Sequence, residues 1–219
     1  MPTVLEEADR PAAQTAELSA TILDEVARGE RPDTLRLIVA RPTFAFGRLD
    51  ALRDGYGEAR AIARSHGFEP VVRTPGGHAA AYHEQCLVVE ETVHEPNSMA
   101  GMHDRFRTRS AALSEALRSL GVDARVGAVP SEYCPGDFSV NARGAVKLAG
   151  TAQRVVRNGW LFASVITVGD VEPLRRVLSA VYEALGMPMD PSTVGGVAGE
   201  VRGAGLQDVR DAVLAAYPT

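Results

Sequence analysis

The sequence predicts an α+β fold in which helices flank a mixed, largely antiparallel sheet. Strand candidates occur in meandering or hairpin-like groups, with helices between the groups. Two candidates lie within residues 138–149, so their connection is much shorter than the dozen or so residues of a parallel crossover. Neither an internal repeat nor an interdomain linker is evident. We therefore expect residues 1–219 to form a single domain with its core at about residues 34–187.

The N-terminal part begins with residues 1–14, an acidic segment that we expect to be loosely attached. Apolar side chains at helical spacing predict a helix over residues 15–28. The run TLRLIVA at residues 34–40 is apolar and rich in β-branched side chains, which predicts a strand. Residues 43–48 extend this strand beyond a proline, and a second helix is predicted over residues 50–65.

The middle of the chain contains short strands and one amphipathic helix. Residues 71–72 and residues 86–93 read as strands, and a Thr-Pro-Gly-Gly turn at residues 74–77 lies between them. An amphipathic pattern predicts a helix over residues 103–120, which leads into a strand over residues 123–129.

The C-terminal part begins with a loop and a predicted hairpin. Its arms are residues 138–141 and 146–149, and Gly144 supplies the positive φ that a hairpin turn needs. The remaining predicted elements are a buried strand at residues 160–168, a helix at 173–185, a glycine-rich loop at 191–205 and a helix at 206–216.

Composition and charge exclude several classes of function. The net charge is -5, and no basic stripe indicates a nucleic-acid-binding surface. No apolar run reaches the roughly 18 residues that a membrane span needs, and the N-terminus lacks the apolar region of a signal peptide. Two cysteines without neighbouring ligands predict neither a disulfide scaffold nor a metal site. We therefore expect a cytoplasmic protein with reduced thiols.

Cys134 and Lys147 are the first candidate site residues. Lys147 is the only lysine in a chain with 23 cationic residues. A nearby cation favours the thiolate form of a cysteine, which is the nucleophilic form. A hairpin turn centred on Arg143 and Gly144 would place Val140 opposite Lys147 and would let the amine approach the thiol. The alternative is that Cys134 is a half-buried loop thiol and Lys147 a surface cation.

A second candidate site is the turn after the strand at residues 71–72. Gly76 and Gly77 permit positive φ and close approach to a ligand, and Arg73 could bind a carboxylate or a phosphate. The same pattern also fits an ordinary turn between two strands. Tyr82 and His83 follow, and His83 is either a base, a polar wall or a hydrogen-bonded strand end.

Three sequence blocks resemble the lipoate-protein ligase and lipoyl/octanoyl transferase superfamily, which is related to biotin-protein ligase. They are FGRLDALRDGYGEARAIARSHGFEPVVR, RTPGGHAAAYH and CPGDFSVNARGAVKLAGTAQR, within about residues 34–168. The resemblance implies a class II synthetase-like catalytic domain. The chain is too short for the C-terminal accessory domain of the long ligases, so we expect none.

The resemblance also implies an activity. The enzyme would move a lipoyl or octanoyl group to the acceptor lysine of a lipoyl domain or of glycine cleavage H protein. Lys147 matches the active-site lysine of the family, and Cys-Pro-Gly resembles the cysteine-dependent lipoyl amidotransferase branch. In that branch Cys134 would carry the acyl group as a thioester, activated by Lys147, and no cofactor would be required. The substrate-binding residues would be Arg73, Gly76, Gly77, His78, Tyr82, His83, Gly150 and Thr151.

Two alternatives remain open at this point. Tyr82 and His83 are closer to the ATP-dependent lipoate-protein ligases, which use ATP and Mg and form an acyl-adenylate. Those ligases have a third glycine where this chain has His78, and an asparagine where it has Gln85 and Cys86. These departures also suit a non-catalytic paralogue that binds the acyl group or a lipoyl-domain partner.

Overall fold

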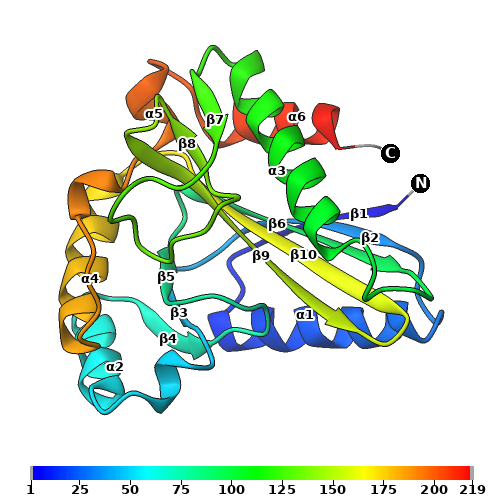
Figure 1. Cartoon of the computed structure of the whole chain (residues 1–219), viewed down its shortest axis with the longest axis horizontal. Coiled ribbons are helices and arrows are strands. Elements are labelled where there is room, and N and C mark those ends of the chain that lie inside the picture. The colour runs from blue at the N-terminus through cyan, green and yellow to red at the C-terminus, as the bar shows by residue number, and fades with distance from the viewer. Residues whose placement is uncertain (1, 218–219) are drawn as a thin grey trace.

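The computed structural model describes residues 2–217, and its largest element is a seven-stranded sheet (Figure 1). Neighbouring strands are antiparallel except for the first pair, β1 with β2. A separate three-stranded sheet has one parallel and one antiparallel pair. In spatial order the large sheet is β1 (Thr3–Ala8), β2 (Thr34–Val39), β6 (Cys86–His94), β10 (Gly159–Thr167), β9 (Val146–Val156), β8 (Val140–Ala142) and β7 (Ala124–Val126), and the small sheet is β4 (Glu69–Val72), β3 (Thr43–Phe46) and β5 (Ala80–Tyr82).

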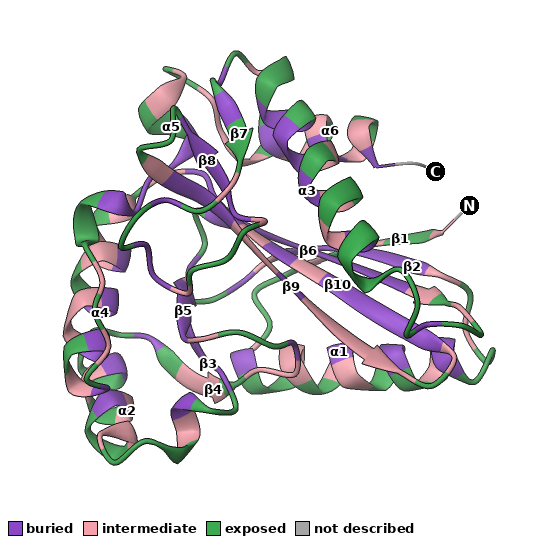
Figure 2. Cartoon of the chain, viewed as in Figure 1, coloured by how far each residue is buried: buried purple, intermediate pink, exposed green. Residues whose placement is uncertain are grey.

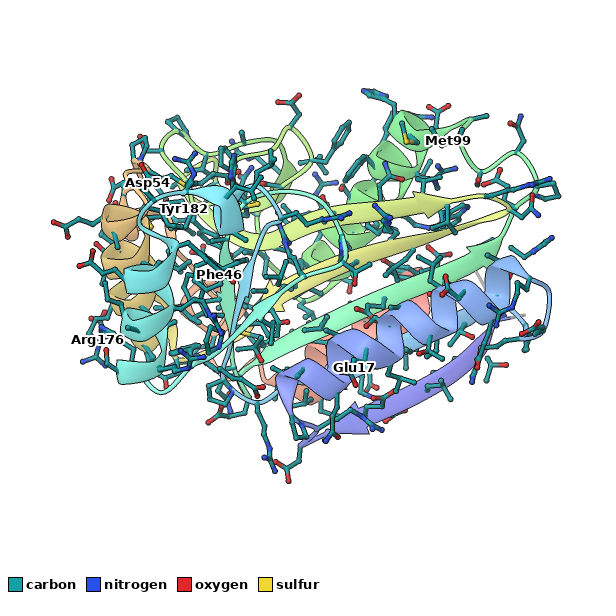
Figure 3. All side chains as sticks on the ribbon, turned by 90° about the horizontal axis from the view of Figure 1, so that it is seen from below. Glu17, Phe46, Asp54, Met99, Arg176 and Tyr182 are labelled. Carbon is teal, nitrogen blue, oxygen red and sulfur yellow. The ribbon has the colours of Figure 1, made fainter. Side chains whose placement is uncertain are left out.

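Helices cover both faces of the large sheet, which confirms the predicted α+β class. α3 and α6 pack on one face, α1 lies along the other, and α2 and α4 pack beside the small sheet (Figures 1 and 3). Each helix within residues 2–217 is too short or too polar to serve as a membrane-spanning segment. The helices are α1 (Ala12–Ala27), α2 (Tyr56–Ser65), α3 (Met102–Ser119), α4 (Val171–Ala184), α5 (Val197–Glu200) and α6 (Leu206–Ala216), with short 3₁₀ turns η1 (Asp50–Leu52) and η2 (Pro191–Thr193).

The central strands are buried on both faces because they lie between these helical layers (Figure 2). On β2 and β6, Leu37 and Val89 belong to the core under α3 and α6, whereas Ile38 and Val88 face the opposite side. Successive side chains of a strand point to opposite faces of the sheet, and here the side chains on both faces are apolar. This produces the continuous hydrophobic runs from which these strands were predicted. A second core joins α2 and α4 to the small sheet.

The N-terminal segment differs from the prediction, since residues 3–8 form β1 and pair in parallel with β2. Arg36 of β2 links this strand to the neighbouring elements. Its buried guanidinium contacts Glu7 of β1 at 3.0 Å, Ser19 of α1 at 2.9 Å and Glu90 of β6 at 2.6 Å. The acidic segment is therefore attached to the sheet by an ion-pair network that no hydrophobic pattern reveals.

Three further predictions need correction. Residues 43–46 do not continue β2 but enter the small sheet as β3; β2 ends at Val39, and Pro42, which has no amide proton for a ladder, lies between the two strands. The predicted loop at residues 191–205 contains η2 and α5. In the hairpin, Ala142 pairs with Val146, so the turn contains residues 143–145 and Asn141, not Val140, lies opposite Lys147; a β-bulge between Val140 and Asn141 then places Val140 opposite Ala149.

Candidate active site

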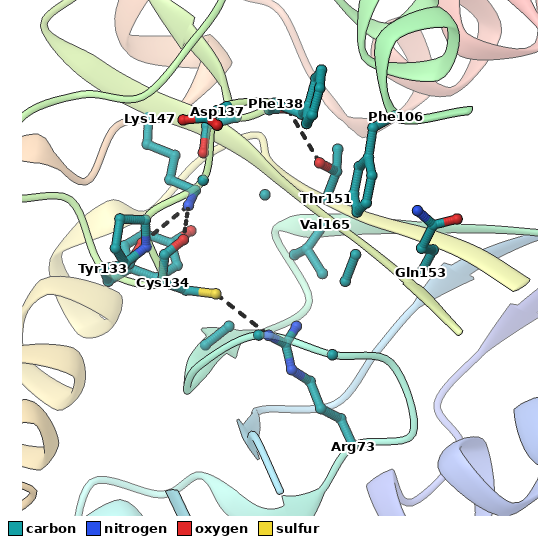
Figure 4. Close-up of a pocket in the computed structure, with 18 of the residues that line it drawn as sticks. Arg73, Phe106, Tyr133, Cys134, Asp137, Phe138, Lys147, Thr151, Gln153 and Val165 are labelled. Atoms are coloured by element: carbon teal, nitrogen blue, oxygen red, sulfur yellow. Dashed lines mark hydrogen bonds between the residues drawn. The ribbon is translucent and has the colours of Figure 1, made fainter. Parts of the chain in front are cut away.

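A cavity of about 410 Å³ lies between the large sheet and two loops (Figure 4). We call residues 73–79 the glycine loop and residues 129–139 the cysteine loop. The volume lies in the range of about 300–1,000 Å³ that is typical of small-molecule sites. The cavity brings together seven of the residues predicted from the sequence. They are Arg73, Gly76, Gly77, Cys134, Lys147, Gly150 and Thr151.

Cys134 is held through its backbone as well as through its thiol. Its N–H donates to the Tyr182 hydroxyl at 2.7 Å, and that hydroxyl donates to the Ala79 carbonyl at 2.7 Å. Its φ is 42°, a left-handed conformation that costs a non-glycine residue of order 1–3 kcal/mol. The loop therefore tolerates strain at the one residue whose thiol faces the cavity, while α4 fixes that residue through Tyr182.

Lys147 is buried on β9 and points at the backbone of the cysteine loop. Its ammonium donates to the carbonyls of Tyr133 at 3.0 Å and Cys134 at 2.9 Å, and lies 3.4 Å from Oε1 of Glu132. Burial lowers the pKa of Lys147, and the Glu132 carboxylate opposes that change. The interpretation of Lys147 as a surface cation is therefore wrong, since its side chain is 1% exposed.

Glu132 is a site residue that the sequence analysis missed. Its buried carboxylate accepts from Ser139 Oγ at 2.6 Å and from the amides of Gly136 at 3.1 Å and Val129 at 3.3 Å. Together with Lys147 these contacts hold the cysteine loop in one conformation. A buried lysine needs an acidic partner, and Glu132, two positions before Cys134, would have been the candidate had burial been expected.

Arg73 is the cation that reaches the thiol. Its Nη2 lies 3.4 Å from Sγ of Cys134 and 2.7 Å from the carbonyl of His78 (Figure 4). Gly77, with φ of 96°, allows this approach, because a Cβ there would lie 2.5 Å from Arg73 Nη2 and 3.1 Å from Sγ. The neighbouring Gly76 amide donates to the carbonyl of Gln153 at 3.4 Å and ties the glycine loop to β9.

Three predicted substrate-binding residues lie outside the lining of this cavity. The His78 ring is directed to Asp50, with Nδ1 and Oδ1 2.9 Å apart. His83 is buried, accepts from the Gln85 amide at Nδ1, and donates from Nε2 to the carbonyl of Asp170. Tyr82 lines a smaller neighbouring cavity, and burial raises the pKa of its hydroxyl. A substrate contact by any of the three stays a prediction.

The wall away from the thiol is apolar. The rings of Phe106 and Phe138 stack at 5.2 Å, and Thr151 Oγ1 donates to the Phe138 carbonyl at 3.2 Å. Gly150 lies against Lys147, whose Cε would be 3.3 Å from a Cβ at that position. A thiol, two cations and an apolar chamber form a site that suits acyl transfer through a covalent intermediate.

Comparisons with known proteins show what this chain is similar to. The sequence model of the family described as "Lipoyl protein ligase A/B catalytic domain" matches residues 11–218. The chain is 29% identical over 130 residues to an octanoyl-[GcvH]:protein N-octanoyltransferase of Exiguobacterium sp., covering 59% of this chain and 46% of the relative. It is 26% identical over 152 residues to the protein of the same name in Bacillus velezensis, covering 68% and 51%. The matched region thus spans about half the length of these relatives.

The fold is similar to that of solved ligases. A lipoate-protein ligase A bound with ATP superposes with a TM-score of 0.77 at 19% identity, covering 98% of this chain and 83% of the ligase. At this identity the likeness concerns the fold alone.

Proposed function

Because the chain belongs to the family of lipoyl protein ligase A/B catalytic domains, we propose that it is an acyltransferase of protein lipoylation. It moves a lipoyl or octanoyl group to the acceptor lysine of a lipoyl domain or of glycine cleavage H protein. The observation that carries the proposal is a half-buried thiol, Cys134, beside two cations in an apolar cavity. The names of the two octanoyltransferase relatives support an octanoyl group and a protein acceptor, and they give octanoyl-[GcvH] as the donor.

The reaction proceeds through two exchanges at Cys134. The thiolate attacks the acyl carbonyl of the donor, a C–S bond forms, and the bond to the leaving amine breaks as that amine takes up a proton. The acceptor lysine, as a free amine, then attacks the thioester; a C–N bond forms as the amine gives up a proton, and the C–S bond breaks as the thiolate leaves. Phe106, Phe138 and Val165 form the wall against which the acyl chain packs.

On this proposal residues 1–219 act as a single catalytic domain, and no cofactor is required. The ligase alternative differs in its first step, because it activates a free acid with Mg-ATP. The paralogue alternative predicts binding without turnover. Of the three, only the transferase forms a covalent thioester at Cys134.

The test is to incubate the protein with an octanoylated donor protein in the absence of ATP and to follow its intact mass. We expect an adduct that hydroxylamine removes, together with transfer to an acceptor protein. Cys134→Ala is expected to form no adduct, while the control Cys86→Ala forms it normally, because Cys86 lies outside the cavity lining. An adduct that persists in Cys134→Ala, or transfer that starts only with free octanoate and Mg-ATP, would overturn the proposal.

A further inference from the structure

We infer that His78 is a positioning residue, and that the contact of its ring with the buried Asp50 anchors the glycine loop against Cys134. This inference deepens the proposed function and rests on it for its catalytic meaning. It changes the role that the sequence suggested, where His78 was one of the residues in contact with the substrate. The ligases that the chain resembles have a glycine at this position, and a glycine has no side chain with which to form such an anchor.

The first argument is the acceptor that η1 presents to the ring. Asp50 is fully buried, and its Oδ1 lies 2.9 Å from Nδ1 of His78. Its other oxygen, Oδ2, accepts from the Gly47 amide at 2.9 Å, which fixes the orientation of the carboxylate. Since a carboxylate only accepts hydrogen bonds, Nδ1 is the donor in this contact. The glycine loop is therefore anchored by a charge-assisted hydrogen bond to an acid that is itself held in place.

The second argument is the close packing of the residue before the anchor. A Cβ at Gly47 would collide with the carbonyl oxygen of Gly77, and a Cβ at Gly77 would lie 3.1 Å from Sγ of Cys134. Gly77 has a φ of 96°, in the left-handed region that glycine adopts without strain. Its backbone is therefore in contact with both the segment before η1 and the thiol. A shift of the loop at His78 changes the distance from Gly77 to the sulfur.

The third argument is a second anchor at the next residue. The Ala79 carbonyl accepts from the Tyr182 hydroxyl at 2.7 Å, and that hydroxyl accepts from the Cys134 amide at 2.7 Å. Burial raises the pKa of Tyr182 well above its usual value, so the hydroxyl stays protonated and keeps donating. Arg53, which follows η1, donates to the carbonyl of Leu185 at the end of α4 at 3.2 Å. Together with the His78 contact, these bonds join η1, the glycine loop, the cysteine loop and α4 in a closed ring.

The anchor affects the rate because both exchanges of the proposed reaction occur at the sulfur beside this loop. Misplacing a group at a reacting centre by about 1 Å costs about a hundredfold in rate. A loop released at His78 loses its alignment with the sulfur, but the apolar wall of Phe106, Phe138 and Val165 stays in place. We therefore expect the loss of the anchor to lower kcat and to leave KM unchanged.

The experiment compares His78→Ala with His78→Asn in acyl transfer from an octanoylated donor protein. We expect His78→Ala to lower kcat about tenfold or more with KM unchanged. His78→Asn is expected to recover most of the lost rate, because the side-chain amide of asparagine donates from nearly the same place as Nδ1. His66→Ala is the matched control, since His66 is exposed at the end of α2. Equal losses in His78→Ala and His78→Asn, or a raised KM at unchanged kcat, would overturn the inference.

Amide hydrogen exchange of the full chain measures the anchor without an acyl donor. In His78→Ala and in Tyr182→Phe, the Cys134 amide is expected to exchange roughly tenfold faster, while the amides of β6 keep their protection. Tyr56→Phe is the control, because the Tyr56 ring packs in the same core as Tyr182. Unchanged exchange at Cys134 in His78→Ala would show that the ring contact does not hold the loops together. Failure of the proposed function is read separately, as absence of the thioester adduct in the wild-type chain.

Discussion

At the scale of single residues, the lone lysine is distinguished by its surroundings and not by its rarity. Lys147 is enclosed by two carbonyls, one carboxylate and the face of the Tyr133 ring, which lies 4.6 Å from Nζ. A compact ammonium with three diverging donors fits this enclosure. A planar guanidinium is larger and presents its donors in a fixed fork, so it does not fit there.

We therefore expect Lys147→Arg to lower the rate of acyl transfer at least about a hundredfold, the size of effect that misplacing a catalytic group by about 1 Å produces. The reason is that the bulkier side chain displaces the carbonyl of Cys134. Initial rates with an octanoylated donor provide the measurement. Arg143→Lys is the matched control, since Arg143 is half exposed and pairs with Glu200 at the hairpin turn. Full activity in Lys147→Arg would contradict the role given to the amine.

Lys147 also predicts how stability depends on pH. Burial lowers its pKa below the ordinary value of 10.5, so the unfolded state binds more protons between the folded pKa and 10.5. The free energy of unfolding therefore gains a contribution that rises with pH in that window. Urea midpoints should show the wild type gaining stability relative to Lys147→Met as the pH approaches about 10. Parallel curves for the two proteins would rule out the effect.

At the scale of elements, the attachment of β1 shows how a charged side chain can determine topology. Arg36 joins β1, α1 and β6 through Glu7, Ser19 and Glu90, and its side chain is 1% exposed. Removing one partner of a buried pair leaves the other charge uncompensated, which typically costs about 3–5 kcal/mol.

Arg36→Met should therefore lower the free energy of unfolding by about 3–5 kcal/mol and abolish amide-exchange protection at residues 3–8. Chemical denaturation and hydrogen exchange measure the two effects. Arg41→Met is the matched control, because Arg41 also pairs with an acid near the N-terminus, Asp9, but at the exposed surface. Little change is expected there. Retained protection in Arg36→Met would mean that backbone pairing alone holds β1.

At the scale of the whole molecule, the cavity lies where the large sheet meets the glycine loop and the cysteine loop. Residues from β5, β9, β10, α3 and both loops line it, so an acyl chain bound there would contact elements distant in sequence. Filling an apolar cavity transfers the chain from water at a gain of about 25 cal/mol per Å². Occupancy should therefore stabilise the folded molecule as a whole.

We expect an octyl chain attached to Cys134 as a mixed disulfide to raise Tm above that of the methyl adduct. Octyl and methyl methanethiosulfonate deliver the two groups by the same chemistry. Each kcal/mol gained should appear as about 2–4 °C for a chain of this size. Cys134→Ala treated with the same reagents should show no difference between them. An octyl adduct no more stable than the methyl adduct would indicate that the cavity does not accept the chain.

The sequence by itself determined the elements with strong periodicity and the α+β class. Residues 86–93 and 160–168 were predicted as strands because buried strands are continuously apolar, and residues 103–120 as a helix because one face repeats at helical spacing. It also indicated that Lys147 could approach the loop that carries Cys134, since a short hairpin brings a loop and a strand together.

Only the tertiary structure decided which side chains meet. The contact between Arg73 and Cys134 joins positions 61 residues apart, and the hydrogen bond from Arg36 to Glu90 joins positions 54 residues apart. The three-residue turn that places Asn141 opposite Lys147, and the bulge that follows it, are local features that a pattern of period two does not encode. Charged residues usually lie at the surface, so the sequence pattern gives no sign that Glu132, Lys147 and Arg36 are buried. Their burial depends on long-range packing, which brings together partners that compensate the loss of water.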